Sequence, residues 1–168
     1  MRVLLGLGGN LGNVPAAFAA AAGALAGRFR LLGCSGLWRT APIGPPQPEF
    51  LNAALLVEAD VDLLRILAIC QHLEVAAGRS RGAEERFGPR ALDIDLLLAR
   101  DLVVESAALT LPHPRLAERR FVLLPAGELV PDWVHPRLHR TLPDLAATVA
   151  AADQPCRRAE PFPPVGCR

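Results

Sequence analysis

The stretch "GPRALDIDLLLAR", residues 88–100, predicts a buried β-strand that carries two aspartates, Asp93 and Asp95. Side chains alternate between the two faces of a strand, so these carboxylates share one face and Ile94 lies on the other. They stand about 7 Å apart along the strand, close enough to repel each other and to favour protonation of one. An exposed strand with solvated carboxylates would explain the pair. A divalent cation would also do so, because Mg²⁺ is commonly held by one or two carboxylates together with substrate phosphates.

Arginines gather on both sides of this strand. The loop 79–90, "RSRGAEERFGPR", carries Arg79, Arg81, Arg86 and Arg90. The guanidinium group matches phosphate oxygens, so this loop resembles a lid that closes over a metal-held polyphosphate. The alternative is a solvated loop in which Glu84 and Glu85 neutralise part of the charge. A second possible anion-binding cluster comprises His113 and the arginines that follow it, Arg115, Arg119 and Arg120.

A separate group of residues is suited to a flat organic ligand. Phe50 opens a predicted strand and Asn52 follows two residues later on the same face. An aromatic face beside an amide suits a heteroaromatic ring with polar edges, and Phe121 offers a second stacking face. The proline-rich loop 41–49 would present backbone groups to the same ring. The alternative for each aromatic residue is simple core packing.

Hydrophobic patterning predicts the element order β-α-β-β-α-β, which is typical of the α+β, ferredoxin-like antiparallel sheet with helices packed on it. The expected strands are 2–10, 29–40, 50–60 and 88–100, and the expected helices are 14–27 and 60–78. Either Asp60 or Asp62 can cap the second helix. A C-terminal extension is expected to hold a helical turn interrupted by Pro125 and a last helix over 141–152. These elements form a single domain over 1–152, and the tail 153–168 is expected to be loosely ordered.

Composition narrows the function classes. The chain has 168 residues and a net charge of +1, so it lacks the bulk charge that attracts nucleic acid or a membrane surface. All 18 basic residues are arginine, which excludes lysine Schiff bases and the lysine of a Walker-type phosphate loop. The four cysteines form no C-x-x-C pair, and neither a signal peptide nor a long uncharged apolar stretch is evident. We therefore expect a cytoplasmic protein.

Several segments resemble, in order, the signatures of one enzyme family, 6-hydroxymethyl-7,8-dihydropterin pyrophosphokinase of the folate pathway. They are "LGLGGNLGN", "RTAPIG" running into "QPEFLNAA", "LEVAAGRSR", "RFGPRALDIDLLL" and "LPHPRLAERRFVLLPAGEL". The resemblance runs from about residue 2 to about residue 131. It implies transfer of pyrophosphate from ATP to the pterin hydroxymethyl oxygen, release of AMP, and the use of two Mg²⁺ ions. It also implies small-molecule substrates, no nucleic-acid or membrane partner, and a monomer.

The resemblance assigns roles by matching position. Asp93 and Asp95 would be the metal ligands and, with Arg79 and Arg90, the catalytic set. The ATP site would comprise Leu67, Gln71, Glu74, Arg79, Arg81, Arg90, Leu96, Thr110, His113 and Arg119. The pterin site would comprise Thr40, Pro42, Ile43, Phe50, Asn52 and Phe121, with the two phenylalanines sandwiching the ring. The chain departs from the family pattern at Gly9, Phe87 and Pro114, where members often have serine, tryptophan and tyrosine; the glycine is expected to affect only its own turn.

Three other classes of protein are alternatives to the pyrophosphokinase family. An RNA-binding module of the same fold would need stacking aromatics along central strands and a basic sheet face, whereas this strand presents two aspartates. A metal-dependent phosphodiesterase or nuclease usually has more carboxylates or histidines at its site. A catalytically silent relative would keep the same residues.

Overall fold

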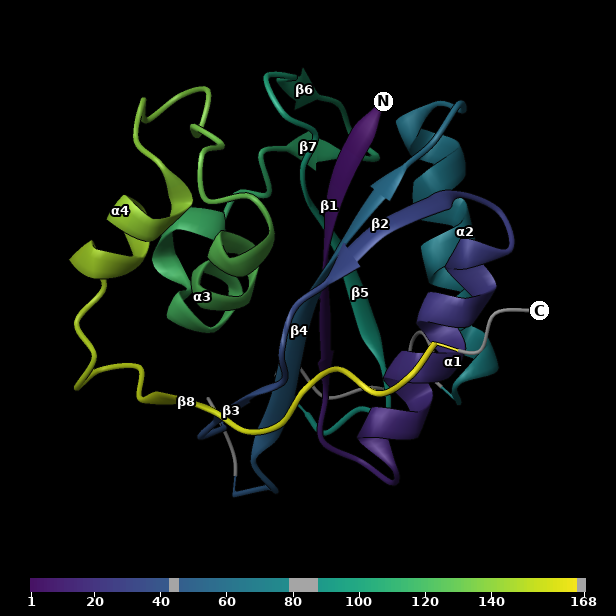
Figure 1. Cartoon of the computed structure of the whole chain (residues 1–168), viewed down its shortest axis with the longest axis vertical. Coiled ribbons are helices and arrows are strands. Elements are labelled where there is room, and N and C mark those ends of the chain that lie inside the picture. The colour runs from purple at the N-terminus through teal and green to yellow at the C-terminus, as the bar shows by residue number, and fades with distance from the viewer. Residues whose placement is uncertain (43–45, 79–87, 166–168) are drawn as a thin grey trace.

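The computed structural model describes residues 1–42, 46–78 and 88–165. The roles expected of Ile43, Arg79, Arg81 and Phe87 therefore fall outside the described residues. A six-stranded antiparallel sheet forms the centre of the molecule (Figure 1). Its strands are β1 (Arg2–Gly9), β2 (Arg30–Cys34), β3 (Trp38–Thr40), β4 (Phe50–Glu58), β5 (Asp93–Leu98) and β8 (Cys156–Arg158). They are arranged in the order β5-β1-β4-β3-β8, and β2 also pairs with β4.

The remaining elements lie on the two faces and at one end of the sheet. They are α1 (Val14–Ala26), α2 (Leu63–Ala76), a 3-10 turn η1 (Leu116–Glu118), α3 (Arg120–Leu129), α4 (Leu142–Thr148), and a small ribbon of β6 (Val104–Glu105) and β7 (Thr110–Leu111). The structure confirms the mixed α/β class with an antiparallel sheet and packed helices. Within the described residues, no helix is both long and apolar enough to cross a membrane.

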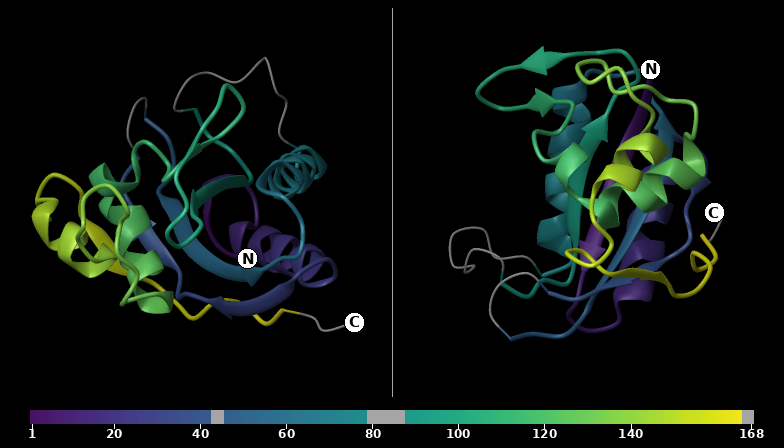
Figure 2. Two further views of the ribbon diagram at one scale, coloured as in Figure 1. Left: turned by 90° about the horizontal axis from the view of Figure 1, so that it is seen from above. Right: turned by 90° about the vertical axis from the view of Figure 1, so that its left-hand side faces the viewer.

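Helices cover both faces of the sheet, as the view from above shows (Figure 2). Strand alternation divides the core in two. Leu5, Leu55 and their neighbours pack with α1 and α2 on one face. Leu4, Ala54 and Leu97 pack with α3 and α4 on the other. α3 and α4 cover part of this second face, and Asp93 and Asp95 of β5 lie on the same face.

Local signals explain where the two long helices begin. The Asn13 side chain accepts a hydrogen bond from the Ala16 amide at 3.1 Å, and proline occupies the first turn of α1. The cap of α2 is Asp62, which accepts from the Arg65 amide at 2.8 Å, so the choice between Asp60 and Asp62 is resolved. Beyond the end of α2, Gly78 has a φ of +97°, a conformation that favours glycine.

Some predicted element limits are wrong. The strand expected over 29–40 is broken into β2 and β3, because Ser35 turns inward and its hydroxyl accepts from the Ala54 amide at 2.8 Å. The helix α3 continues through Pro125, where a kink or break is common. Burial of Leu123 and Ala126 against the sheet holds the helix together despite the missing proline donor. The helix expected over 141–152 ends at Thr148.

The C-terminal segment also differs from the loose tail that its composition predicts. Cys156–Arg158 pairs antiparallel with β3, and this pairing extends to two backbone hydrogen bonds between Leu37 and the residues Ala159 and Glu160, each 2.8 Å long. Further along, the Phe162 ring stacks on Phe18 of α1 with ring centroids 6.5 Å apart. Backbone pairing and one aromatic contact therefore secure a segment that has almost no hydrophobic periodicity.

Gly9 has a role beyond its turn. A β-carbon at this position would lie 2.6 Å from the Ala91 carbonyl oxygen and 3.2 Å from Val14 Cγ1. The end of β1 and the start of β5 therefore approach so closely that only glycine fits without a shift of the backbone.

Candidate active site

The site occupies a row of residues across the second face of the sheet. Gly8 of β1 pairs with Asp93 of β5 on one side and with Asn52 of β4 on the other. Gly6 pairs with Asp95 in the same way. Gly8 has no side chain, so it separates Asp93 from Asn52 without standing between them. Neighbouring strands are about 4.8 Å apart, so the backbones of these two residues are about 10 Å apart across the sheet.

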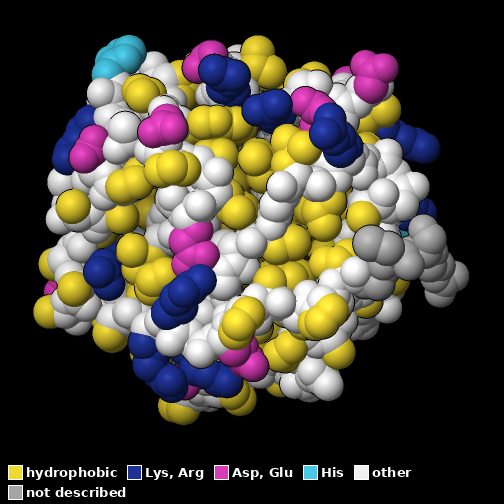
Figure 3. Space-filling view, in the orientation of Figure 1, with side chains coloured by type: hydrophobic (Ala, Val, Ile, Leu, Met, Phe, Trp, Pro, Cys, Tyr) yellow, Lys and Arg dark blue, Asp and Glu magenta, His cyan; other side chains and the backbone are white. Residues whose placement is uncertain are grey.

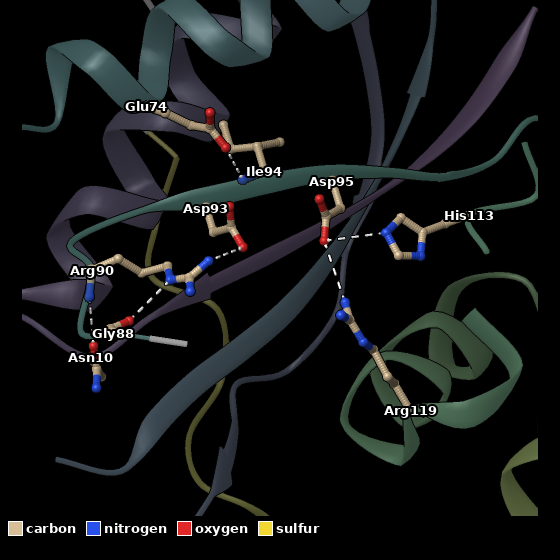
Figure 4. A network of polar contacts seen from close by, with 9 residues as sticks. All are labelled: Asn10, Glu74, Gly88, Arg90, Asp93, Ile94, Asp95, His113 and Arg119. Atoms are coloured by element: carbon tan, nitrogen blue, oxygen red, sulfur yellow. Dashed lines mark hydrogen bonds and ion pairs between the residues drawn. The ribbon is translucent and has the colours of Figure 1, made fainter. Parts of the chain in front are cut away.

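Each aspartate faces its own cation (Figure 4). The Arg90 guanidinium donates to Asp93, with 2.9 Å between Nη1 and Oδ2. Asp95 Oδ2 lies 3.7 Å from Arg119 Nη1 and 3.9 Å from His113 Nε2. Both carboxylates remain reachable, with side-chain exposures of 24% for Asp93 and 38% for Asp95. Repulsion within the pair is thus offset by two arginines from separate parts of the chain, Arg90 and Arg119.

His113 is a neutral member of this cluster. Burial, reinforced by the positive charges of Arg119 and Arg115, lowers the pKa of His113 to about 4. Its Nδ1 accepts a hydrogen bond from the Arg115 amide at 3.1 Å, which leaves the ring proton on Nε2, facing Asp95. Arg119 is therefore the permanent cation beside Asp95, and His113 directs its N–H toward Asp95 from 3.9 Å, beyond hydrogen-bond distance. Burial also lowers the pKa of Arg119, followed in effect by repulsion from Arg115.

The chemistry of the acidic pair suits a hard divalent cation. Two carboxylates on one face supply the oxygen ligands that Mg²⁺ prefers, and phosphate oxygens and water normally complete its six-fold shell. Among the described residues there is no group of three or more His, Cys, Asp or Glu side chains that could hold a metal without substrate. The donor set fits an ion that is held jointly by the protein and a phosphate ligand.

The residues expected to bind ATP fall into two groups. Arg90, His113 and Arg119 meet at the acidic pair. Leu67, Gln71 and Glu74 lie on α2, which packs beside β5, and Leu96 is buried on that helical side of the sheet. Thr110 lies in β7, which also contacts β5. Arg79 and Arg81 lie outside the described residues.

Glu74 has a structural contact that its expected role did not include. Its side chain is 3% exposed, and its Oε1 accepts a hydrogen bond from the Ile94 amide at 2.8 Å. Ile94 is the residue between the two aspartates (Figure 4). Glu74 therefore holds the strand backbone that sets the direction of both carboxylates.

Three of the residues expected to bind the pterin line a neighbouring pocket, and two others, Phe50 and Asn52, lie beside Thr40 in the sheet. The Asn52 amide donates to Thr40 Oγ1 at 3.0 Å and to the Trp38 carbonyl at 3.4 Å, and the residue is 5% exposed. Phe50 pairs with Thr40 in the strand register and so shares its face. Thr40, Pro42 and Phe121 line one pocket of about 70 Å³. The two hydrogen bonds to Thr40 and Trp38 hold the Asn52 amide in one orientation.

Sequence reasoning missed Asn10. This residue is 7% exposed, and its side-chain amide donates to Gln47 Oε1 at 3.0 Å and to the Pro48 carbonyl at 3.1 Å. Its side-chain oxygen accepts from the Arg90 amide at 2.8 Å. One asparagine thus connects the proline-rich loop with the start of β5. The "GGN" turn was the only sequence signal, and it indicated a bend without indicating the partners.

An antiparallel sheet whose exposed row carries two carboxylates among arginines is the arrangement expected of a metal-assisted, phosphate-transferring enzyme. Comparison with known proteins identifies the family. Residues 4–131 match the family described as 7,8-dihydro-6-hydroxymethylpterin-pyrophosphokinase (HPPK). The chain belongs to this family.

Individual relatives of the chain have the same enzyme name. A 2-amino-4-hydroxy-6-hydroxymethyldihydropteridine pyrophosphokinase of Synechocystis sp. is 37% identical over 150 residues, which cover 87% of this chain and 75% of the relative. An enzyme of the same name from Methylorubrum extorquens is 40% identical over 136 residues, or 79% of this chain and 85% of the relative. The crystal structure of wild-type Plasmodium falciparum HPPK-DHPS superposes with a TM-score of 0.66 at 14% identity, over 87% of this chain and 44% of that longer chain. This last likeness concerns the fold alone.

Proposed function

We propose that this protein transfers pyrophosphate from ATP to the hydroxymethyl oxygen of 6-hydroxymethyl-7,8-dihydropterin, forming the pterin diphosphate and AMP in folate biosynthesis. The observation that carries the proposal is the row Asp93–Gly8–Asn52. In this proposal Asp93, a member of the acidic pair that binds cations, lies about two strand spacings from a buried amide that reads the edge of the pterin ring. Membership of the pyrophosphokinase family supports the same reaction.

The proposal includes the ferredoxin-like topology. If β2 and β3 are taken as one interrupted strand, the order of the four framework strands is fourth, first, third, second, all antiparallel. That order supports the split β-α-β arrangement. It also includes a monomeric, cytoplasmic enzyme of one domain that uses small molecules and has no nucleic-acid or membrane partner, consistent with a net charge of +1.

In this reaction Asp93 and Asp95 would hold two Mg²⁺ ions together with the ATP phosphates. When bound, the metal neutralises phosphate oxygens and polarises the phosphorus that is attacked. Arg90 and Arg119, which contact the aspartates, would bind the phosphates, as would Arg79 and Arg81. Thr40, Pro42, Ile43, Asn52 and the two phenylalanines, Phe50 and Phe121, hold the pterin.

The chemical step forms a bond between the pterin oxygen and the β-phosphorus of ATP and breaks the bridge between the α- and β-phosphates. The leaving group is AMP, and the hydroxyl proton passes to solvent. His113 is a poor general base because its pKa is lowered to about 4 by burial. Positioning and electrostatic stabilisation of the phosphate charge therefore supply most of the rate, as is general for phosphoryl transfer.

The nucleotide product tests the proposal. Incubation with ATP, Mg²⁺ and the reduced hydroxymethylpterin should yield AMP and no ADP, measured by ion-exchange chromatography. Asp95→Asn should lower turnover by at least about 100-fold while the fold is retained, because it removes a metal ligand. Asp101→Asn is the matched control, since that aspartate is 86% exposed and faces Arg100 at the surface. Formation of ADP, or an active Asp95→Asn variant, would contradict the proposal.

A further inference from the structure

The C-terminal segment contributes to the pocket from outside the part of the chain that defines the family. The family match ends at residue 131, whereas β8 begins at Cys156. In the strand register Thr40 pairs with Phe50 on one side and with Cys156 on the other. Residues directly opposite one another in a sheet share a face, so Phe50, Thr40 and Cys156 form a continuous row. The tail thus widens the surface on which the pterin site is built.

The same segment closes one side of the pocket. Thr40, Ala41, Pro42 and Phe121 line it from the body of the domain, and Asp153, Gln154, Pro155 and Cys156 line it from the tail. Half of the lining residues therefore come from the tail. Three of the other half are residues expected to contact the pterin.

Gln154 fixes the position of the wall that carries Phe121. Its Oε1 accepts from the Arg120 amide at 2.9 Å, and its Nε2 donates to the Glu118 carbonyl at 2.8 Å. Arg119, which precedes α3, provides no side-chain cap within the described structure. Gln154 thus satisfies the exposed amide of the first helical residue from a distant part of the chain. Phe121 is the next residue of this helix.

Ion pairs hold the segment on both sides. Arg157 contacts Glu49 at 2.7 Å, next to Phe50, and Arg158 contacts Glu128 of α3 at 3.4 Å. Figure 3 shows basic side chains gathered over β8 and β3 with acidic side chains beside them. Such exposed pairs contribute little energy each, about 0–1 kcal/mol. Together with the backbone pairing to β3 they keep the segment in one position.

We propose that residues 153–156 are a positioning and specificity element for the organic substrate, with Gln154 placing Phe121 and Cys156 limiting the space at the ring edge. This inference rests on the proposed pterin pyrophosphokinase activity. Cys156 lies on the pocket side of the segment, with Thr40, Pro42 and Phe121 among the other lining residues. Changes at Cys156 should therefore alter use of the pterin more than use of ATP.

A matched pair of variants separates this role from general stability. Cys156→Phe adds bulk on the pocket face, whereas Ala159→Phe adds it at an exposed position three residues later that does not line the pocket. We expect the first to raise the pterin KM about 10-fold or more, with the ATP KM within about 2-fold. The second should leave both constants near wild type. Equal effects of the two variants, or a rise confined to the ATP KM, would overturn the inference.

Gln154→Ala tests the placement of Phe121. Loss of both hydrogen bonds should raise the pterin KM several-fold, and the ATP KM by less, because the two bonds also flank Arg119. Gln154→Glu keeps the acceptor for the Arg120 amide and should retain part of the wild-type affinity. A pterin KM equal to wild type in Gln154→Ala would remove Gln154 from the element.

Thiol labelling gives a readout that does not depend on turnover. Trypsin releases Cys156 alone on the peptide 141–157, apart from the other three cysteines. With Mg²⁺ and a non-hydrolysable ATP analogue present throughout, the reduced hydroxymethylpterin should slow N-ethylmaleimide labelling of Cys156. Unchanged labelling at saturating pterin would contradict the inference. If wild type forms AMP while the tail variants and the labelling show no effect, only this inference fails; if wild type forms no AMP, the proposed function fails.

Discussion

Asp93 and Asp95 illustrate how much a two-residue spacing determines at the scale of single residues. Strand alternation predicted their shared face, and the structure confirms it through their pairing with Gly8 and Gly6. The sequence could not reveal that Arg90 would approach one carboxylate, and Arg119 and His113 the other. Those contacts depend on the path of the chain between strands, which side-chain periodicity does not encode.

Replacement of Asn10 tests whether its side chain connects the proline-rich loop with the start of β5, and Asn13 offers a matched control. Asn10→Asp keeps the acceptor for the Arg90 amide but loses the donor to Gln47 and Pro48. It also sets a carboxylate against a carbonyl oxygen. We expect a loss of about 1–3 kcal/mol in the free energy of unfolding, together with a raised KM for both substrates.

The control, Asn13→Asp, preserves a helix cap, because aspartate and asparagine cap equally well. Its urea midpoint and both KM values should match those of wild type. Equal behaviour of the two variants would show that the Asn10 amide does not connect the two loops.

Replacement of Gly9 and of Gly23 by alanine should change the free energy of unfolding in opposite directions. A β-carbon at Gly9 would meet the Ala91 carbonyl at 2.6 Å, whereas at Gly23 the nearest atom is Val165 Cγ1 at 4.0 Å. Gly9→Ala should lower the free energy of unfolding by about 1–3 kcal/mol. Gly23→Ala, inside α1, should raise it by about 0.5–1 kcal/mol. Urea unfolding of both variants checks this, and a neutral Gly9→Ala would mean that the strand ends can separate freely.

At the scale of elements, the sequence predicted which segments form helices and strands better than it predicted where each of them begins and ends. The two long helices and the central strands β1 and β4 have strong apolar patterns and lie within three residues of their predicted limits, whereas β5 occupies only Asp93–Leu98 of the expected 88–100. The break between β2 and β3 was missed because its cause is the hydrogen bond from the Ala54 amide to Ser35. The continuity of α3 through Pro125 was missed because tertiary burial outweighs a local breaker.

The cap of α2 gives a test at this scale. Asp62→Ala should lower the free energy of unfolding by about 1 kcal/mol, because it removes the acceptor for the Arg65 amide. Asp60→Ala, two residues earlier and outside the cap, should change it by less than about 0.5 kcal/mol. Chemical denaturation with both variants would decide, and a larger effect at Asp60 would contradict the assigned cap.

At the scale of the whole molecule, the C-terminal segment joins parts that the sequence treated as separate. It extends the sheet beside β3 and then crosses toward α1, where Phe162 stacks on Phe18 (Figure 1). Composition could not predict this because proline and arginine suggest a solvated chain, and strand pairing is set by partners distant in sequence. For the same reason, the sequence did not predict that residues 153–156 line the pocket.

Phe162→Ala measures this attachment. Phe162 is half-buried, so its loss should lower the free energy of unfolding by about 1–2 kcal/mol. Pro164→Ala, an exposed position two residues later, should change it by less than about 0.5 kcal/mol. Thermal and urea unfolding provide the comparison, and a neutral Phe162→Ala would show that the segment is not secured at this point.

The fate of the β-phosphate of ATP tests the central claim most directly. Wild-type protein is incubated with Mg²⁺, the reduced hydroxymethylpterin and ATP carrying a radioactive label at the β-phosphorus, and the products are separated by chromatography. The proposed transfer of pyrophosphate at the row Asp93–Gly8–Asn52 predicts that the label moves entirely into the pterin product. The nucleotide product should then be unlabelled AMP. Label retained in ADP would mean that only the terminal phosphate is transferred and would contradict the account.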